Sequence, residues 1–198
     1  MRTVCVLLGL MSLAVTAAAA EPYFLSDPSL SPDGQTVVFA CEGDIWSVPA
    51  AGGTAVRLTG MDGEEQRPRF SPDGRSIAFS SSQAGNADVY VMPAAGGSIT
   101  RLTWHEADDL VDSWSWDART IYFTSSRHND FAAYAVSAGG GTPRRLMAHY
   151  FNTVHAVAEH PQSGEYFFTD SWESFRFANR KRYQGDYNPD IKSWNPRS

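Results

Sequence analysis

Residues 69–103 read RFSPDGRSIAFSSSQAGNADVYVMPAAGGSITRLT, and residues 29–59 run through the same series as SLSPDGQTVVFACEGDIWSVPAAGGTAVRLT. Each copy has a Ser-Pro-Asp-Gly turn, an apolar run, an Asp-led aromatic run, a Gly-Gly turn and an Arg-Leu-Thr ending. The endings begin at Arg57, Arg101 and, in the altered form Arg-Leu-Met, at Arg145, which are spaced by 44 residues. Self-similarity at such a period indicates a repeat architecture.

Four units can be aligned on this period. The turn motif is degraded to Ser-Trp-Asp-Ala at residues 115–118 in the third unit and to His-Pro-Gln-Ser-Gly at residues 160–164 in the fourth. The units predicted from the alignment cover about residues 24–59, 64–103, 108–147 and 152–198.

Each unit is predicted to contain four short β-strands. In the second unit the turn is followed by the runs SIAFSSS, DVYVMPA and SITRLT, whose apolar residues alternate without a helical period. Four antiparallel strands recurring every 40–45 residues are typical of a β-propeller blade. A β-sandwich is the structural alternative, but it does not explain the fixed spacing. We therefore predict an all-β fold with about four propeller blades.

Two groups of residues within the repeat have open interpretations. Asp44, Asp88 and Asp190 open the third strands, where we expect them to brace the turn after the second strand; a ligand role is the alternative. Trp104, Trp114 and Trp116 cluster around the junction of the second and third units. We expect these three indoles to pack between blades, with a central-channel lining as the alternative.

The first twenty residues have the pattern of a secretory signal peptide. Arg2 is followed by an apolar run at residues 4–15 and by four alanines before Glu21. The run is short for a spanning helix, although a membrane anchor is an alternative. We predict a periplasmic or secreted protein, residues 21–198, with no membrane association after cleavage.

Charge and cysteine content argue against a nucleic-acid-binding protein and against a domain stabilised by disulfides. The chain has 16 Lys and Arg against 22 Asp and Glu, a formal net charge of −6, which argues against a nucleic-acid partner. Removal of the signal, whose one charged residue is Arg2, would make the charge −7 and leave Cys41 as the single cysteine. One thiol cannot form an internal disulfide, so Cys41 is interpreted as a small buried apolar residue.

No known catalytic or metal-binding motif is found in the sequence. It lacks Gly-x-Ser-x-Gly, His-Glu-x-x-His, a Gly-rich phosphate loop and Cys-x-x-Cys. Asp108, Asp109 and Asp112 form an acidic group that could attract calcium, but without the spacing of a calcium loop we interpret it as a solvated loop. We expect no catalytic residue, no metal site and no cofactor in this chain.

The segment WESFRFANRKRYQGDYN at residues 172–188 mixes basic and aromatic side chains where the earlier units have a short turn. One interpretation is an elongated hairpin with an exposed charged face. The other is a docking arm for a neighbouring domain or an acidic peptide end, since arginine binds carboxylates well. The candidate docking residues are Arg176, Arg180, Lys181 and Arg182.

The motif SPDGRSIAFSS…GNADVYVMPAAGGSITRLT resembles the WD40-like blades of TolB and of the N-terminal propeller of tricorn proteases. Residues 101–130, RLTWHEADDLVDSWSWDARTIYFTSSRHND, and residues 170–195, DSWESFRFANRKRYQGDYNPDIKSWN, are similar to blades of bacterial tricorn-like serine proteases. The resemblance implies a large peptidase with one or two propellers, a PDZ-like domain and a separate catalytic domain. It also implies a six-bladed ring, so four blades are expected to be an incomplete propeller from a longer chain.

The resemblance leaves three functions open. The first is the propeller portion of an exported serine peptidase, inactive by itself, that guides peptides or unfolded polypeptide or docks other domains of a parent that can form homo-oligomers. The second is a TolB-like envelope propeller that binds proteins. The third is the propeller of another hydrolase, such as an amidohydrolase or a prolyl-oligopeptidase relative.

Overall fold

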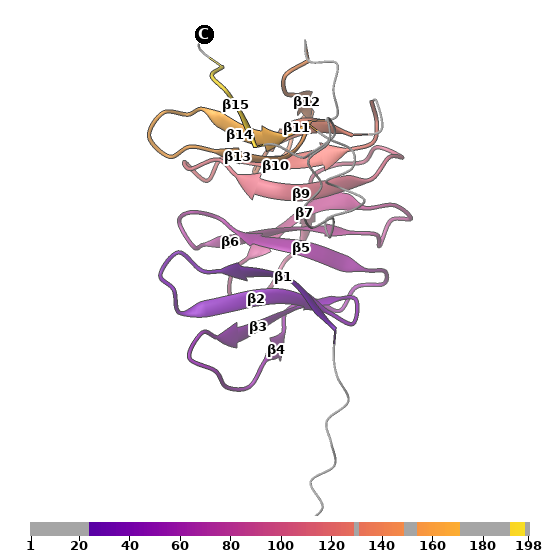
Figure 1. Cartoon of the computed structure of the whole chain (residues 1–198). Helices are drawn as coiled ribbons and strands as arrows, with labels where there is room; N and C mark the ends of the chain where they lie inside the picture. Colours follow the sequence, from indigo (N-terminus) through magenta and orange to yellow (C-terminus); the bar gives the residue numbers. More distant parts are fainter. Residues whose placement is uncertain (1–23, 129–130, 149–153, 171–190, 197–198) are drawn as a thin grey trace, which may run out of the picture.

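The computed structural model describes residues 24–128, 131–148, 154–170 and 191–196, which form four antiparallel β-sheets (Figure 1). Blade 1 contains β1 (Leu25–Leu30), β2 (Thr36–Cys41), β3 (Asp44–Pro49) and β4 (Val56–Arg57). Blade 2 contains β5 (Glu65–Phe70), β6 (Ser76–Ser81), β7 (Asp88–Pro93) and β8 (Thr100–Arg101). Blade 3 contains β9 (Asp109–Trp114), β10 (Thr120–Ser125), β11 (Ala132–Ser137) and β12 (Arg144–Arg145). Blade 4 contains β13 (His155–Glu159), β14 (Tyr166–Thr169) and β15 (Lys192–Trp194).

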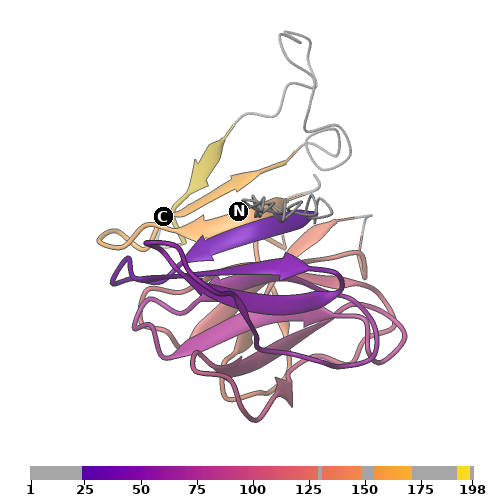
Figure 2. The same cartoon turned by 90° about the horizontal axis from the view of Figure 1, so that it is seen from below.

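The four sheets stack in chain order, and in each the strands follow one another in sequence order (Figure 1). The first strands, β1, β5, β9 and β13, pack against one another from sheet to sheet, so they form the inner side of the stack (Figure 2). Sheets that meet at their first strands and fan outward are propeller blades. The predicted all-β fold with an incomplete ring of blades is confirmed. None of the described residues belongs to a helix long and apolar enough to cross a membrane.

The arginines that are spaced by 44 residues occupy equivalent positions in the structure. Arg57 lies opposite Trp46 in blade 1, and Arg101 lies opposite Tyr90 in blade 2. In blade 3, Arg145 lies opposite Tyr134. The arginine of each repeat therefore occupies the same place at the outer edge of three successive sheets, as the sequence predicted.

The Ser-Pro-Asp-Gly turn joins the first two strands through its own side chains. In blade 2 the Ser71 hydroxyl donates to Asp73 Oδ1 over 2.6 Å, and this same carboxylate oxygen accepts from the Arg75 N–H. The Ser76 N–H donates in turn to Ser71 Oγ over 3.0 Å. Equivalent bonds occur in blade 1 around Ser31 and Asp33, and in blade 3 around Ser115 and Asp117. The turn thus survives in blade 3 despite its altered sequence.

Ala118 holds the glycine position of this turn in blade 3. Its φ of 58° is left-handed, like the 73° of Gly34 and 71° of Gly74. A Cβ atom is strained in this region. We expect Ala118→Gly to raise the free energy of unfolding by about 1 kcal/mol, measured by urea denaturation. The reciprocal change, Gly74→Ala, should lower it by a similar amount; a loss of stability on Ala118→Gly would contradict this account.

The hydrophobic core lies between blades. Phe79 of blade 2 packs with Val38 and Ile45 of blade 1, and Phe123 of blade 3 packs with Ala78 and Val89 of blade 2. A third cluster fills the junction of blades 3 and 4. These side chains are buried because each sheet covers the face of the next.

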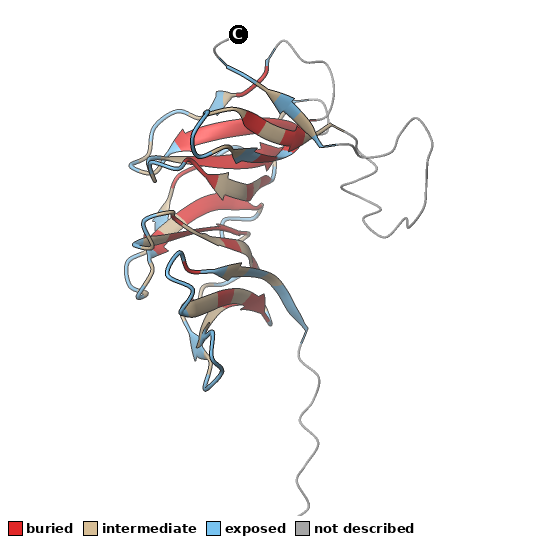
Figure 3. Ribbon diagram, turned by 60° about the vertical axis from the view of Figure 1, so that its left-hand side comes forward, coloured by how far each residue is buried: buried red, intermediate tan, exposed pale blue. Residues whose placement is uncertain are grey.

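Blade 1 has no preceding sheet among the described residues. Phe39, which matches the fully buried Phe79 and Phe123, is only half-buried. With Val37 and Val48 it lines an apolar hollow of about 420 Å³. Figure 3 shows the contrast: the strands of blades 2 and 3 are largely buried, whereas blade 1 is mostly intermediate or exposed.

The backbones of adjacent blades are joined sparingly. The Glu65 N–H donates to the Gly43 carbonyl across the junction of blades 1 and 2 over 2.8 Å. The Asp109 N–H donates to the Ala87 carbonyl across the junction of blades 2 and 3 over 2.6 Å. Most of the contact at these junctions is therefore made by side chains.

Candidate functional site

The aspartates that open the third strands form a repeated side-chain network. Asp88 accepts from the Thr103 hydroxyl at Oδ1 over 3.0 Å and from Arg101 Nη2 at Oδ2 over 2.5 Å. Asp44 makes the matching bonds with Thr59 and Arg57 at 3.3 Å each. Burial raises the pKa of Asp88, and the bonds from Thr103 and Arg101 oppose the rise.

These contacts correct one sequence-based expectation. The Asp44 and Asp88 carboxylates bind the end of the fourth strand, not the turn after the second strand. Asp190 lies outside the described residues. In blade 3 the matching positions are Ala132 and Met147, which cannot form this network.

The acidic group of residues 108–112 was predicted to be a solvated loop; this is wrong for Asp109 and Asp112, whereas Asp108 is exposed and precedes the strand. Asp109 and Asp112 belong to strand β9, and Asp109 is fully buried, where it forms an ion pair with Arg127. Asp108 Oδ1 accepts from the Ala87 N–H over 3.0 Å. In the described part of the chain, no three metal-binding side chains converge. These carboxylates hold strands and blades together.

Asp112 connects three blades from the inner strand β9. Its Oδ2 accepts from the Thr124 hydroxyl over 2.7 Å and from the Val157 N–H of blade 4 over 3.3 Å. Its Oδ1 faces Arg67 of blade 2 at 3.4 Å. Burial raises the pKa of Asp112 to about 6, although Thr124 and Arg67 favour the anion. Arg69, also of blade 2, donates from Nε to the Asp112 carbonyl over 3.2 Å.

The three tryptophans were predicted to pack between blades, but only Trp114 is buried. Its indole donates to the Arg69 carbonyl over 2.9 Å between blades 2 and 3. Trp104 is 63 % exposed beneath the Arg101 guanidinium, and Trp116 is 52 % exposed. Trp116 replaces the proline of the Ser-Pro-Asp-Gly turn, and its Nε1 donates to the Glu159 carbonyl over 2.5 Å.

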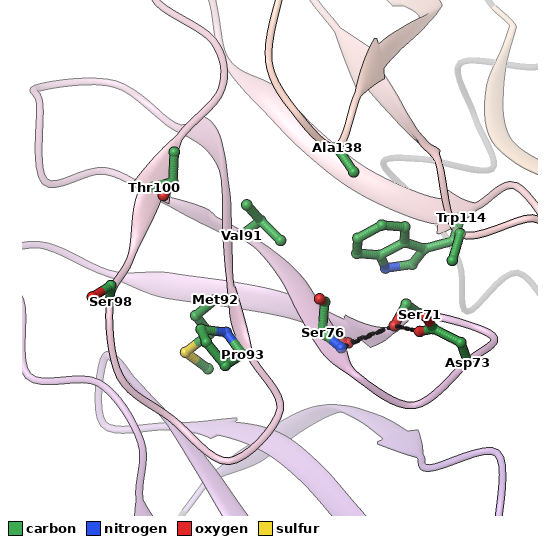
Figure 4. A pocket seen from close by; sticks show the side chains of 11 residues that line it. Ser71, Asp73, Ser76, Val91, Met92, Pro93, Ser98, Thr100, Trp114 and Ala138 are labelled. Carbon is green, nitrogen blue, oxygen red and sulfur yellow. Dashed lines mark hydrogen bonds between the residues drawn. The ribbon is translucent and has the colours of Figure 1, made fainter.

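A groove of about 300 Å³ lies between blades 2 and 3 beside Trp114 (Figure 4). Val91 of β7 points toward the Trp114 indole, and hydroxyl groups border the opening. The lining residues are Ser71, Asp73, Ser76, Val91, Met92, Pro93, Ser98, Thr100, Trp114, Ala118 and Ala138. More of the exposed lining is polar than apolar, so the groove offers hydroxyl groups beside a smaller apolar surface. Asp73 Oδ1 is already committed to its own turn.

Arg176, Arg180, Lys181 and Arg182, and the predicted signal at residues 1–20, lie outside the described residues. Sequence reasoning missed Glu65 and Arg67, which lie at blade junctions, and Arg127, which pairs with Asp109 within blade 3. Glu65 and Asp109 are separated by 44 residues, the period of the repeat, and this spacing could have revealed them as equivalent positions.

Comparison with known proteins gives the repeat its family. The family described as the tricorn protease N-terminal beta propeller domain matches residues 22–198. The chain belongs to this family. The resemblance predicted from the Ser-Pro-Asp-Gly blades is confirmed: the chain is a tricorn-type N-terminal propeller.

A curated relative of this tricorn-type propeller is itself named as a tricorn protease homolog. Tricorn protease homolog 1 of Streptomyces coelicolor is 38% identical over 73 residues, which cover 37% of this chain and 7% of that protein. The chain therefore matches a small fraction of the length of that relative.

Solved structures show the same fold. The crystal structure of the tricorn protease aligns with a TM-score of 0.70 and 20% identity, covering 87% of this chain and 17% of that one. TolB from Acinetobacter baumannii aligns with a TM-score of 0.64 and 20% identity, covering 87% and 41%. At this identity the two structures support the blade architecture.

Proposed function

We propose that this propeller is the non-catalytic N-terminal portion of an exported tricorn-like serine peptidase. It guides peptides, or docks other domains of the parent protein, while downstream domains carry out proteolysis. The family match over residues 22–198 is the observation that carries this proposal. The apolar run followed by four alanines at residues 1–20 supports export.

The described side chains suit binding. The buried carboxylates are engaged with threonine, serine and arginine partners within the blades. The groove beside Trp114 offers hydroxyls and apolar contact. The basic segment at residues 172–188 supplies groups for a peptide carboxylate, because guanidinium binds carboxylate in a bidentate manner.

The test is peptide binding without cleavage. Residues 21–198 are titrated into labelled unstructured peptides that end in a free carboxylate or in an amide, and binding is followed by fluorescence anisotropy. We expect the carboxylate peptides to bind about tenfold more tightly, as one charge-assisted contact allows. The fourfold change of Arg176, Arg180, Lys181 and Arg182 to alanine should remove this difference, and no peptide should be cleaved.

Two outcomes would count against the proposal. Cleavage of the peptides by residues 21–198 would contradict a non-catalytic role. If the original protein and the fourfold variant each bound the carboxylate peptide and the amide peptide with equal affinity, the proposed guiding of peptide carboxylates would be contradicted. A chain that binds folded envelope proteins and no peptide would instead favour the TolB-like alternative. The matched control changes Arg75 and Arg119, exposed arginines in turns of blades 2 and 3, to alanine.

A further inference from the structure

Glu65 is a buried acid between blades 1 and 2 with one oxygen that lacks a partner. It begins strand β5 and is 2 % exposed. Its Oε1 accepts from the Ser81 hydroxyl over 2.9 Å. Its Oε2 is buried without a hydrogen-bond partner among the described residues. An anion in this position would leave a charged oxygen unsatisfied, which is costly away from water.

The neighbouring hydroxyl has already used its proton. Thr59 lies near the Glu65 carboxyl, and its Oγ1 accepts from the Ile45 N–H over 2.8 Å. The Thr59 hydroxyl donates to Asp44 Oδ1 over 3.3 Å. A hydroxyl has one proton and two lone pairs, so one lone pair of Thr59 is left to accept. A protonated Glu65 can donate to it, whereas an ionised Glu65 would keep only the Ser81 hydroxyl as a donor and would leave Oε2 beside oxygen lone pairs and the Asp44 carboxylate.

At the junction of blades 2 and 3, the position equivalent to Glu65 is an acid that has a cationic partner. Asp109, 44 residues after Glu65, lies beside Thr103, which accepts from the Val89 N–H and donates to Asp88. Here Arg127 forms an ion pair with Asp109 Oδ2. The position 44 residues before Arg127 is Gln83, which is neutral. The junction of blades 1 and 2 therefore has the acid without the matching arginine.

The other groups that face Glu65 do not replace that arginine. From β3, the Asp44 carboxylate disfavours a second negative charge, and Tyr90 of β7 lies within electrostatic range. From β4, Arg57 pairs with Asp44 while its side chain is 56% exposed. From β6, the Ser81 hydroxyl favours the anion, as the Thr59 hydroxyl does when it turns from Asp44 toward Glu65. Burial is the largest influence, and it raises the pKa of Glu65 above the ordinary value of 4.5.

We propose that Glu65 keeps its proton in the folded protein at pH values where an exposed glutamate is ionised, and donates it to Thr59. The junction of blades 1 and 2 is then a pH-sensitive clasp. Because the folded state holds this proton more tightly than the unfolded state, its contribution is complete below pH 4.5. The contribution is lost as pH rises through the raised pKa of Glu65, and blade 1 then separates more easily from blade 2.

The direct test is a carbon-13 NMR titration of glutamate side-chain carboxyls in the full chain, with Glu65 assigned by its absence in Glu65→Gln. We expect the Glu65 midpoint to lie above 4.5. In Gln83→Arg, which supplies the cation found at the next junction, the midpoint should move down. A Glu65 midpoint at or below 4.5 in the original protein would overturn the proposal.

Hydrogen exchange gives a second readout. After correction for intrinsic rates, the opening equilibrium of blade 1 amides should rise by up to about tenfold per pH unit between pH 4.5 and the Glu65 midpoint, and level off above that midpoint. Glu65→Gln keeps a donor toward Thr59 without a titrating proton, so this rise should vanish. Asp109→Asn, the matched control, removes the Arg127 partner and should open blade 3 without removing the blade 1 response. A blade 1 response that survives in Glu65→Gln would overturn the proposal.

Discussion

Phe123→Ala is expected to lower the free energy of unfolding by about 3–5 kcal/mol, as measured by urea denaturation. The Phe123 ring is fully buried between blades 2 and 3, stacked on Tyr134 with centroids 5.7 Å apart. The Arg127 guanidinium lies 5.6 Å from its centroid. Truncation would therefore remove the apolar contact and leave a cavity in the junction.

The repeat supplies a matched control for this substitution. Phe39 occupies the same place in blade 1 but is only half-buried, because no described sheet covers that face. Phe39→Ala should cost about 1–2 kcal/mol, since less apolar area leaves water there on folding. Equal losses for Phe39→Ala and Phe123→Ala would show that the two junction faces are buried alike, contrary to the structure.

Asp112→Ala should also destabilise strongly, by about 3–5 kcal/mol at neutral pH. The change strands the Thr124 hydroxyl and the Val157 N–H and removes an ion-pair partner of Arg67. Three blades lose their shared contact at once. Urea denaturation with a probe in blade 4 would measure the loss, and a change below about 1 kcal/mol would contradict the linking role.

The same residue gives the stability a pH dependence. Burial raises the pKa of Asp112 from 3.8 to about 6. The folded state therefore binds a proton more tightly than the unfolded state, so this contribution is complete below about pH 4 and falls as pH rises through 6. Asp112→Asn cannot titrate and should remove that part of the decline. Unchanged slopes in Asp112→Asn between pH 4 and 6 would contradict the assignment.

The blade architecture could be predicted because its information is local and repeated. Strand alternation, the Ser-Pro-Asp-Gly turn and the spacing of Arg57, Arg101 and Arg145 each lie within one unit. The equivalent positions of these arginines follow once the units are aligned. The confirmed fold therefore needed no information about contacts between blades.

The candidate site was harder because its partners lie in different units. Asp109 and Asp112 look like surface acids until Arg127, Thr124 and Val157 are placed beside them. The exposure of Trp116 could have been foreseen, since it aligns with the prolines of exposed turns. Sequence patterns report burial within a strand well, but they do not show which neighbouring sheet neutralises a charge.

The sparse backbone bonding between adjacent blades has a consequence for how such a protein can evolve. All the strands of each described sheet come from one continuous stretch, and one main-chain bond is described at each of the first two junctions. Gain or loss of a 44-residue module by tandem duplication or deletion leaves the strand pairing of every other module intact. The evolutionary constraint falls on the facing side chains at the new boundary, which must match in shape and charge.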